Sequence, residues 1–176
     1  MSIFAPGLEP LPGRSQTGES SAMNEKFLVL ERNIQSDLEA IDRLFEALGA
    51  PELGDSEPQE SLIVTAYRLH GLYTALENIF RNIAAAFENH LDNSSWHRDL
   101  LQRMRLDLTP IRPAVIDAAA YEKLDEMRRF RHVFRTLYGL ELDPLRLRVA
   151  LRKALELKPL YRIQIERFLE FLRGIE

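Results

Sequence analysis

The sequence of residues 58–91, PQESLIVTAYRLHGLYTALENIFRNIAAAFENHL, decides the fold of this chain. Its apolar residues recur at intervals of three and four, which is the spacing of one broad face of a long helix. That face is formed by Leu62, Leu69, Leu72, Tyr73, Leu76, Ile79, Phe80, Ile83 and Phe87. Gly71 lies inside the pattern and predicts a tight crossing with a neighbouring helix at that point.

The segment before this helix carries the same period. An amphipathic helix is expected over residues 24–48, ended by Gly49 and Pro51. Residues 1–22 hold three prolines, three glycines and four serines with little periodicity. We therefore expect a disordered N-terminal arm over 1–22 and a single domain over 23–176.

Two further helices are predicted after the long one. A short helix runs from Trp96 to about Leu106. A longer helix is capped at its start by Asp117 and stops at Gly139, since glycine commonly follows the last residue of a helix.

The last helical segment begins at Asp143, with Pro144 in its first position. Pro159 is expected to break or kink it, which leaves residues 160–173 as a final amphipathic piece. No segment has the pattern of a strand. We predict an all-α, up-and-down helical bundle with about four main helices and short extra helices.

The composition excludes several kinds of chemistry. The 176 residues include no cysteine, which rules out disulfides, thiolate metal sites and thiol nucleophiles. The four histidines are scattered without metal-ligand spacing, so we expect neither a metal nor another cofactor. No signal peptide is recognisable, and no apolar run approaches the ~20 residues that span a bilayer. We expect a cytoplasmic protein without a membrane partner.

Charge is distributed unevenly along the chain. Residues 1–95 carry six basic and fifteen acidic side chains, whereas residues 96–176 carry seventeen basic and twelve acidic ones. Fourteen of those seventeen are arginines, which bind phosphate in a planar, bidentate geometry. Two interpretations are open: a solvated helix surface, or a binding surface for an anionic partner.

The arginines are densest in residues 128–139, RRFRHVFRTLYG. Spacings of three, four and three place one set of side chains on the same helix face: Arg128, Arg131, Arg135 and Tyr138. Such a face suits a phosphodiester between its guanidiniums. Alternatively, the arginines pair with acidic residues of the same helix, namely Glu122, Asp125 and Glu126.

Three blocks of the sequence resemble HepT-like proteins of the HEPN superfamily. They are 69–77 (LHGLYTALE), 96–101 (WHRDLL) with 112–116 (RPAVI), and 130–139 (FRHVFRTLYG), the last being the most specific. The resemblance implies a helical bundle that forms homodimers with two signature motifs in one cleft. It also implies metal-independent ribonuclease activity on RNA, as a toxin paired with a small nucleotidyltransferase antitoxin.

The family signature is an arginine, four to six further residues, a histidine and often a tyrosine two residues later. By resemblance, Arg131 matches the arginine, and Tyr138 matches the tyrosine and is a candidate site for nucleotide transfer. Thr136 stands at the histidine position. Cleaving RNA without metal needs a group that titrates near neutral pH, which threonine lacks. His132 is a possible substitute, although the next residue of a helix is rotated by ~100° from Arg131.

Three hypotheses follow. In the first, the chain is a HepT-like ribonuclease with catalytic candidates Arg131, His132 and Thr136, and with Arg128 and Arg135 helping to bind phosphate. In the second, it is a catalytically weakened HEPN dimer that acts as an interaction protein with a nucleotidyltransferase partner. The third is a purely structural bundle. The substitution at Thr136 predicts weak or lost ribonuclease activity, with the dimer cleft and partner binding retained.

Overall fold

The computed structural model describes residues 16–49, 53–54, 56–87, 96–136 and 142–175, without the side chains of 16–22, 96–98 and 136. These residues form five helices and no strand, which confirms the predicted all-α bundle. The helices are α1 (Gln16–Leu48), α2 (Gln59–Phe87), α3 (Trp96–Met104), α4 (Ala118–Thr136) and α5 (Pro144–Arg173).

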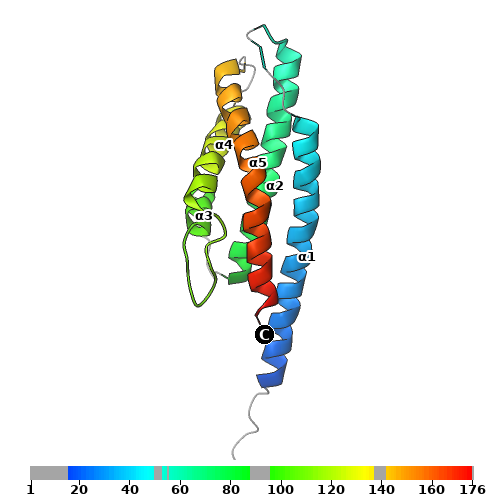
Figure 1. Ribbon diagram of the computed structural model, residues 1–176, viewed down its shortest axis with the longest axis vertical. Coiled ribbons are helices and arrows are strands. Elements are labelled where there is room, and N and C mark those ends of the chain that lie inside the picture. The colour runs from blue at the N-terminus through cyan, green and yellow to red at the C-terminus, as the bar shows by residue number, and fades with distance from the viewer. Residues whose placement is uncertain (1–15, 50–52, 55, 88–95, 137–141, 176) are drawn as a thin grey trace, which may run out of the picture.

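The four long helices lie side by side and alternate in direction, while the short α3 lies beside the lower half of α4 (Figure 1). Helix α1 packs on α2, and α4 packs on α5. Helix α2 also contacts α3, α4 and α5, so it touches every other helix of the bundle. The segment that decides the fold in the sequence is therefore central in the structure.

The core contains the predicted apolar face of α2, of which only Phe87 is half-buried rather than buried. Each fully buried side chain of this size contributes ~1.5–3 kcal/mol relative to leaving it in water. One charged residue, Glu77, lies on the same buried face and is only 1% exposed. Burying an unpaired carboxylate is costly, so we expect a cationic side chain beside it.

Two helix boundaries differ from the sequence prediction. Helix α1 begins at Gln16 rather than near residue 24, so residues 16–22 are helical instead of belonging to the arm. The last proline of the predicted arm is Pro12, so residues 16–22 all keep their backbone N–H groups. A helix that is anchored by its later turns can extend over them despite Gly18. For residues 1–15, which lie outside the described part, the arm stays a prediction.

Helix α5 corrects a second prediction. Its start is as expected, because Asp143 caps it by accepting the Leu145 N–H at 2.9 Å, with Pro144 following. Of the two outcomes expected at Pro159, the break is wrong, since α5 continues to Arg173 as one helix, and the kink stays a prediction. Proline removes a single N–H donor here, and the buried Leu157 and Tyr161 on either side hold both halves against the core.

Gly71 also behaves differently from the prediction. A Cβ atom at this position would meet only Leu44 Cδ2, at 3.6 Å, which is an ordinary contact. No backbone atom of a neighbouring helix lies within 4 Å of that Cβ position. The tight helix crossing expected at Gly71 is therefore wrong. Gly71 instead lies half-buried along a groove on the open side of α2.

The connection between α3 and α4 is organised by Arg112, whose side chain is fully buried. Its guanidinium donates hydrogen bonds to three carbonyl oxygens, those of Arg103 at 3.0 Å, Leu106 at 3.3 Å and Pro113 at 3.2 Å. Asp117 then caps α4 by accepting the Ala120 N–H at 2.7 Å, as predicted. These contacts fix where α4 starts and hence how it faces α2.

Candidate functional site

The ionisable side chains of α2 and α4 meet where the two helices pack together. On α2, His70, Tyr73 and Glu77 follow one another at spacings of three and four, so they share one side of the helix. On α4, Arg131 and Arg135 are one turn apart. We call these five residues the α2–α4 cluster.

Arg131 is the best-anchored member of the cluster. Its Nη2 lies 3.5 Å from Glu77 Oε2, and its side chain is only 12% exposed. Its guanidinium also lies over the ring of Tyr73, 5.7 Å from the centroid, in a cation–π contact. Its Nε is buried and has no hydrogen-bond partner among the described residues. The ion pair and the cation–π contact therefore fix the position of the Arg131 guanidinium between α2 and α4.

Glu77 forms ion pairs with arginines of both α2 and α4. Besides Arg131, its Oε2 lies 3.9 Å from Arg81 Nη2 on the next turn of α2. Arg81 is 46% exposed, so the buried Arg131 partnership carries most of the compensation for burying this carboxylate. Burial, and then the nearby Glu77 charge, raise the pKa of Tyr73, which keeps the phenol neutral.

His70 lies at the edge of the cluster, half-buried, with its ring centroid 5.8 Å from that of Phe134 on α4. Its Nδ1 is buried and has no hydrogen-bond partner among the described residues. Burial lowers the pKa of His70, and the Arg131 and Arg135 guanidiniums lower it further, against a smaller opposing effect of Glu77. The imidazole is thus neutral at pH 7 and able to accept a proton.

The other arginines predicted to bind phosphate differ in their surroundings. Arg128 is paired with Asp125 at 2.8 Å, and Arg129 binds the same carboxylate at 2.7 Å. Arg135 is exposed and makes no ion pair with any described residue. The two open interpretations therefore apply to different residues: Arg128 is salt-bridged on its own helix, whereas Arg135 faces solvent.

The remaining predicted site residues lie beyond the cluster or outside the described part. His132 is exposed on α4. Thr136 is the last residue of α4, but its side chain is not among those described. Tyr138, the candidate for nucleotide transfer, lies wholly outside the described residues. The acid Glu122, expected to pair with the arginines, instead accepts a hydrogen bond from Lys153 at 2.8 Å.

Comparison with known protein families places this geometry in context. The family model described as HepT-like protein matches residues 64–172, which run from the first turns of α2 to the end of α5. The chain belongs to the HepT-like family. Searches of curated proteins and of solved structures found no match. The match includes all five residues of the α2–α4 cluster.

Of the five cluster residues in this HepT-like chain, the sequence signature points only to Arg131. The α2 members lie in the block 69–77, whose resemblance to the family gives them no individual role. Their spacing was the available signal, because it sets a histidine, a phenol and a carboxylate on one side of α2. What the spacing could not give was that this side faces α4.

A groove runs along the open side of α2 beside His70, with a volume of about 520 Å³. Besides His70, Gly71 and Thr74, it is lined by Tyr67, Arg68, Ala75, Asn78 and Arg81 of α2 and by Asp37 and Leu44 of α1. Burial raises the pKa of Asp37, whose Oδ2 accepts a hydrogen bond from Asn78 at 2.9 Å. The HepT-like chain thus has a space of ligand size next to its only half-buried histidine among the described side chains.

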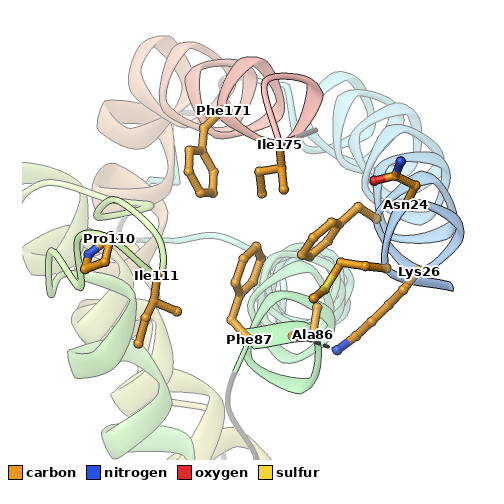
Figure 2. Close-up of a pocket in the computed structure, with 10 residues that line it drawn as sticks. Asn24, Lys26, Ala86, Phe87, Pro110, Ile111, Phe171 and Ile175 are labelled. Atoms are coloured by element: carbon orange, nitrogen blue, oxygen red, sulfur yellow. Dashed lines mark hydrogen bonds between the residues drawn. The ribbon is translucent and has the colours of Figure 1, made fainter. Parts of the chain in front are cut away.

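A second pocket, of about 630 Å³, lies at the other end of the bundle. Figure 2 shows Phe87, Phe171 and Ile175 pointing into it, with Ile111 at its side. Lys26 is its one charged lining residue, and its Nζ donates a hydrogen bond to the Ala86 carbonyl at 2.5 Å. The lining of this pocket is mostly apolar and includes no histidine and no carboxylate.

Among the described side chains, no group of three or more histidines and acidic residues is arranged to hold a metal ion. None of the described helices is both long enough and apolar enough to cross a membrane.

Proposed function

We propose that this HepT-like chain is a HEPN-type ribonuclease that binds an RNA phosphodiester at the α2–α4 cluster and cleaves it without metal. The observation that carries the proposal is the pair of arginines one turn apart on α4. Arg131 is held 3.5 Å from Glu77, and Arg135 is exposed and makes no ion pair with any described residue. A phosphate oxygen is a natural acceptor for guanidiniums placed in this way.

The charges around Arg131 support an anionic ligand. Arg81 and Arg131 both approach the carboxylate of Glu77, and Arg135 faces solvent without an ion pair to any described residue. The side chain of Arg131 is only 12% exposed, so part of this positive charge lies in a low-dielectric environment. Charge–charge attraction to a phosphate is stronger there than on an open surface.

A second candidate function is supported by the residue at the signature histidine position. Thr136 has no group that titrates near neutral pH, which favours a catalytically weakened protein that binds RNA or a protein partner. In this alternative the α2–α4 cluster binds an anion but does not cleave it. The two functions predict the same binding and opposite outcomes for cleavage.

The resemblance to the family also motivates proposals about partners. We propose that the chain acts in the cytoplasm as a homodimer, with two α2–α4 clusters near one cleft, and as the toxin of a pair. A small nucleotidyltransferase would be the antitoxin, transferring a nucleotide to the Tyr138 hydroxyl. Co-expression followed by intact-mass measurement tests this, because transfer adds one nucleotide mass to the native chain and none to Tyr138→Phe.

The ribonuclease proposal is tested with purified protein and a fluorescently labelled single-stranded RNA in EDTA. The native chain is compared with Arg135→Ala and with the matched control Arg129→Ala. Both variants lose one exposed arginine from α4, but Arg129 binds Asp125 on another side of the helix. We expect Arg135→Ala to weaken RNA binding about tenfold, on the order of 1.4 kcal/mol for one phosphate contact, and Arg129→Ala to change it little.

Cleavage separates the two candidate functions in the same assay. RNA cut in EDTA, with fragments that end in 2′,3′-cyclic phosphate, supports the ribonuclease. RNA bound with the same preference for Arg135 over Arg129 but left intact supports the weakened protein. Equal loss of binding in both variants would mean that overall charge, not the α2–α4 cluster, attracts the RNA.

A further inference from the structure

We infer that His70 is the acid–base residue of this site, supplying from α2 the function that Thr136 cannot supply from α4. The inference rests on the proposed ribonuclease function and goes beyond it by naming the residue that moves the proton. It also differs from the sequence interpretation, in which His132 is the possible substitute and weak or lost activity is predicted.

The position of His70 is the first argument. Its ring packs on Phe134, one residue before Arg135, and it borders the groove of about 520 Å³ along α2. It therefore borders the groove and also contacts α4, the helix that carries Arg131 and Arg135. His132 is on α4 next to Arg131, and it is exposed.

The hydrogen-bonding state of His70 is the second argument. Its buried Nδ1 has no partner among the described residues, and no hydrogen bond of its ring to them occurs. A histidine that serves only the fold usually makes at least one such bond. Because Nδ1 is the buried nitrogen and His70 lines the groove, we take Nε2 as the nitrogen that meets a ligand there. The ring is thus held by packing with its reactive nitrogen uncommitted.

The surrounding charges are the third argument. Arg131 and Arg135 face His70 from α4, Glu77 lies two turns along α2, and Asp37 of α1 lines the same groove. The arginines favour the neutral imidazole, which is the form that accepts a proton. The same arginines would stabilise the negative charge that develops on the phosphate during cleavage.

The proposed step balances without any further reagent. His70 Nε2 takes the proton of the RNA 2′-hydroxyl, and the 2′-oxygen forms a bond to phosphorus. The bond between phosphorus and the 5′-oxygen breaks, and the leaving oxygen takes a proton from water. Protonated His70 then returns its proton to the hydroxide so formed. The products are a 2′,3′-cyclic phosphate and a 5′-hydroxyl end.

The test is the pH dependence of RNA cleavage by the native chain, His70→Gln, His132→Gln and Arg135→Gln in EDTA. For the native chain, we expect kcat to rise with pH through a pKa below the ordinary histidine value of about 6.5, and then to level off. His70→Gln should lower kcat about 100-fold or more, leave KM nearly unchanged, and abolish this acid limb. Arg135→Gln should move the limb to higher pH, because one cation that opposes protonation is gone.

Each outcome separates the inference from the function on which it rests. Cleavage that survives His70→Gln with its acid limb intact overturns the inference and leaves the ribonuclease in place. Loss of the limb in His132→Gln alone assigns the role to His132 instead. A native chain that cuts no RNA at any pH overturns the proposed ribonuclease together with the inference.

A second measurement does not depend on how well His70→Gln folds. In the native protein, the imidazole Cε1–H signal of His70 is titrated by NMR with and without a 2′-O-methyl RNA oligonucleotide, which binds but cannot be cut. Bound phosphate should raise the pKa of His70 by offsetting the two arginines. A titration that is unchanged by saturating RNA would contradict contact between His70 and the substrate.

Discussion

Replacing Glu77 by glutamine tests whether its ion pair with Arg131 stabilises the α2–α4 cluster. The substitution keeps the shape of the side chain but removes the negative charge that pairs with Arg131. Arg131 Nη2 lies 3.5 Å from Glu77 Oε2, and the arginine side chain is only 12% exposed. Removing one partner of a buried ion pair costs ~3–5 kcal/mol, and the residual exposure of Arg131 favours the lower end of that range. We therefore expect the free energy of unfolding to fall by about 3 kcal/mol.

Urea denaturation followed by far-UV circular dichroism measures this change. With an m value of ~2 kcal/mol/M for a protein of this size, the midpoint should fall by about 1.5 M at constant m. The matched control is Glu39→Gln, which breaks the ion pair between Glu39 and Arg43. Their charged atoms are 4.0 Å apart, and the two side chains are 75% and 69% exposed. That control should change stability by less than ~0.5 kcal/mol.

The double variant Glu77→Gln with Arg131→Gln completes the experiment. Because it removes both buried charges, it should be less destabilised than the sum of the two single variants. Additive effects would mean that Glu77 and Arg131 do not interact. A Glu77→Gln variant as stable as Glu39→Gln would refute the view that Glu77 holds Arg131 in place.

Two predictions concern the contacts that position α4. Arg112→Met should lower the free energy of unfolding by about 3 kcal/mol or more, since three carbonyl oxygens lose a charged donor, and urea denaturation measures it. A change below about 1 kcal/mol would contradict this role. Asp117→Ala should cost about 1 kcal/mol at pH 7, whereas Asp117→Asn keeps the cap. The hydrogen bond from Ala120 lowers the pKa of Asp117, so its contribution is complete above the ordinary carboxyl pKa and is lost as the pH falls through the lowered one. Equal stability differences at pH 7 and pH 2 would contradict that linkage.

The helices of this fold were predictable because their apolar period is long and regular. The buried face of α2 and the caps at Asp117 and Asp143 follow directly from residue spacing and side-chain chemistry. The predicted helix boundaries are wrong where packing of the whole helix outweighs the preference of a single residue. Pro159 did not end α5, because packing on both sides outweighs one missing hydrogen bond.

The candidate site was only half visible in the sequence. Arg131 stands out by its signature, and its neighbours on α4 could be placed on a face by counting residues. Its partners Glu77, Tyr73 and His70 lie more than fifty positions earlier, on another helix. Spacing within one helix cannot reveal a contact between two, because the rotation of each helix is set by the packing of the whole bundle.

The most direct test of the α2–α4 cluster as an RNA site is backbone NMR with a 2′-O-methyl RNA oligonucleotide in EDTA. We expect the amide signals of His70, Glu77, Arg131 and Arg135 to shift on binding, while those around the apolar pocket, such as Phe171, remain in place. Shifts confined to the apolar pocket, or an absence of shifts at RNA concentrations that saturate binding by fluorescence, would contradict the assignment of function to the α2–α4 cluster.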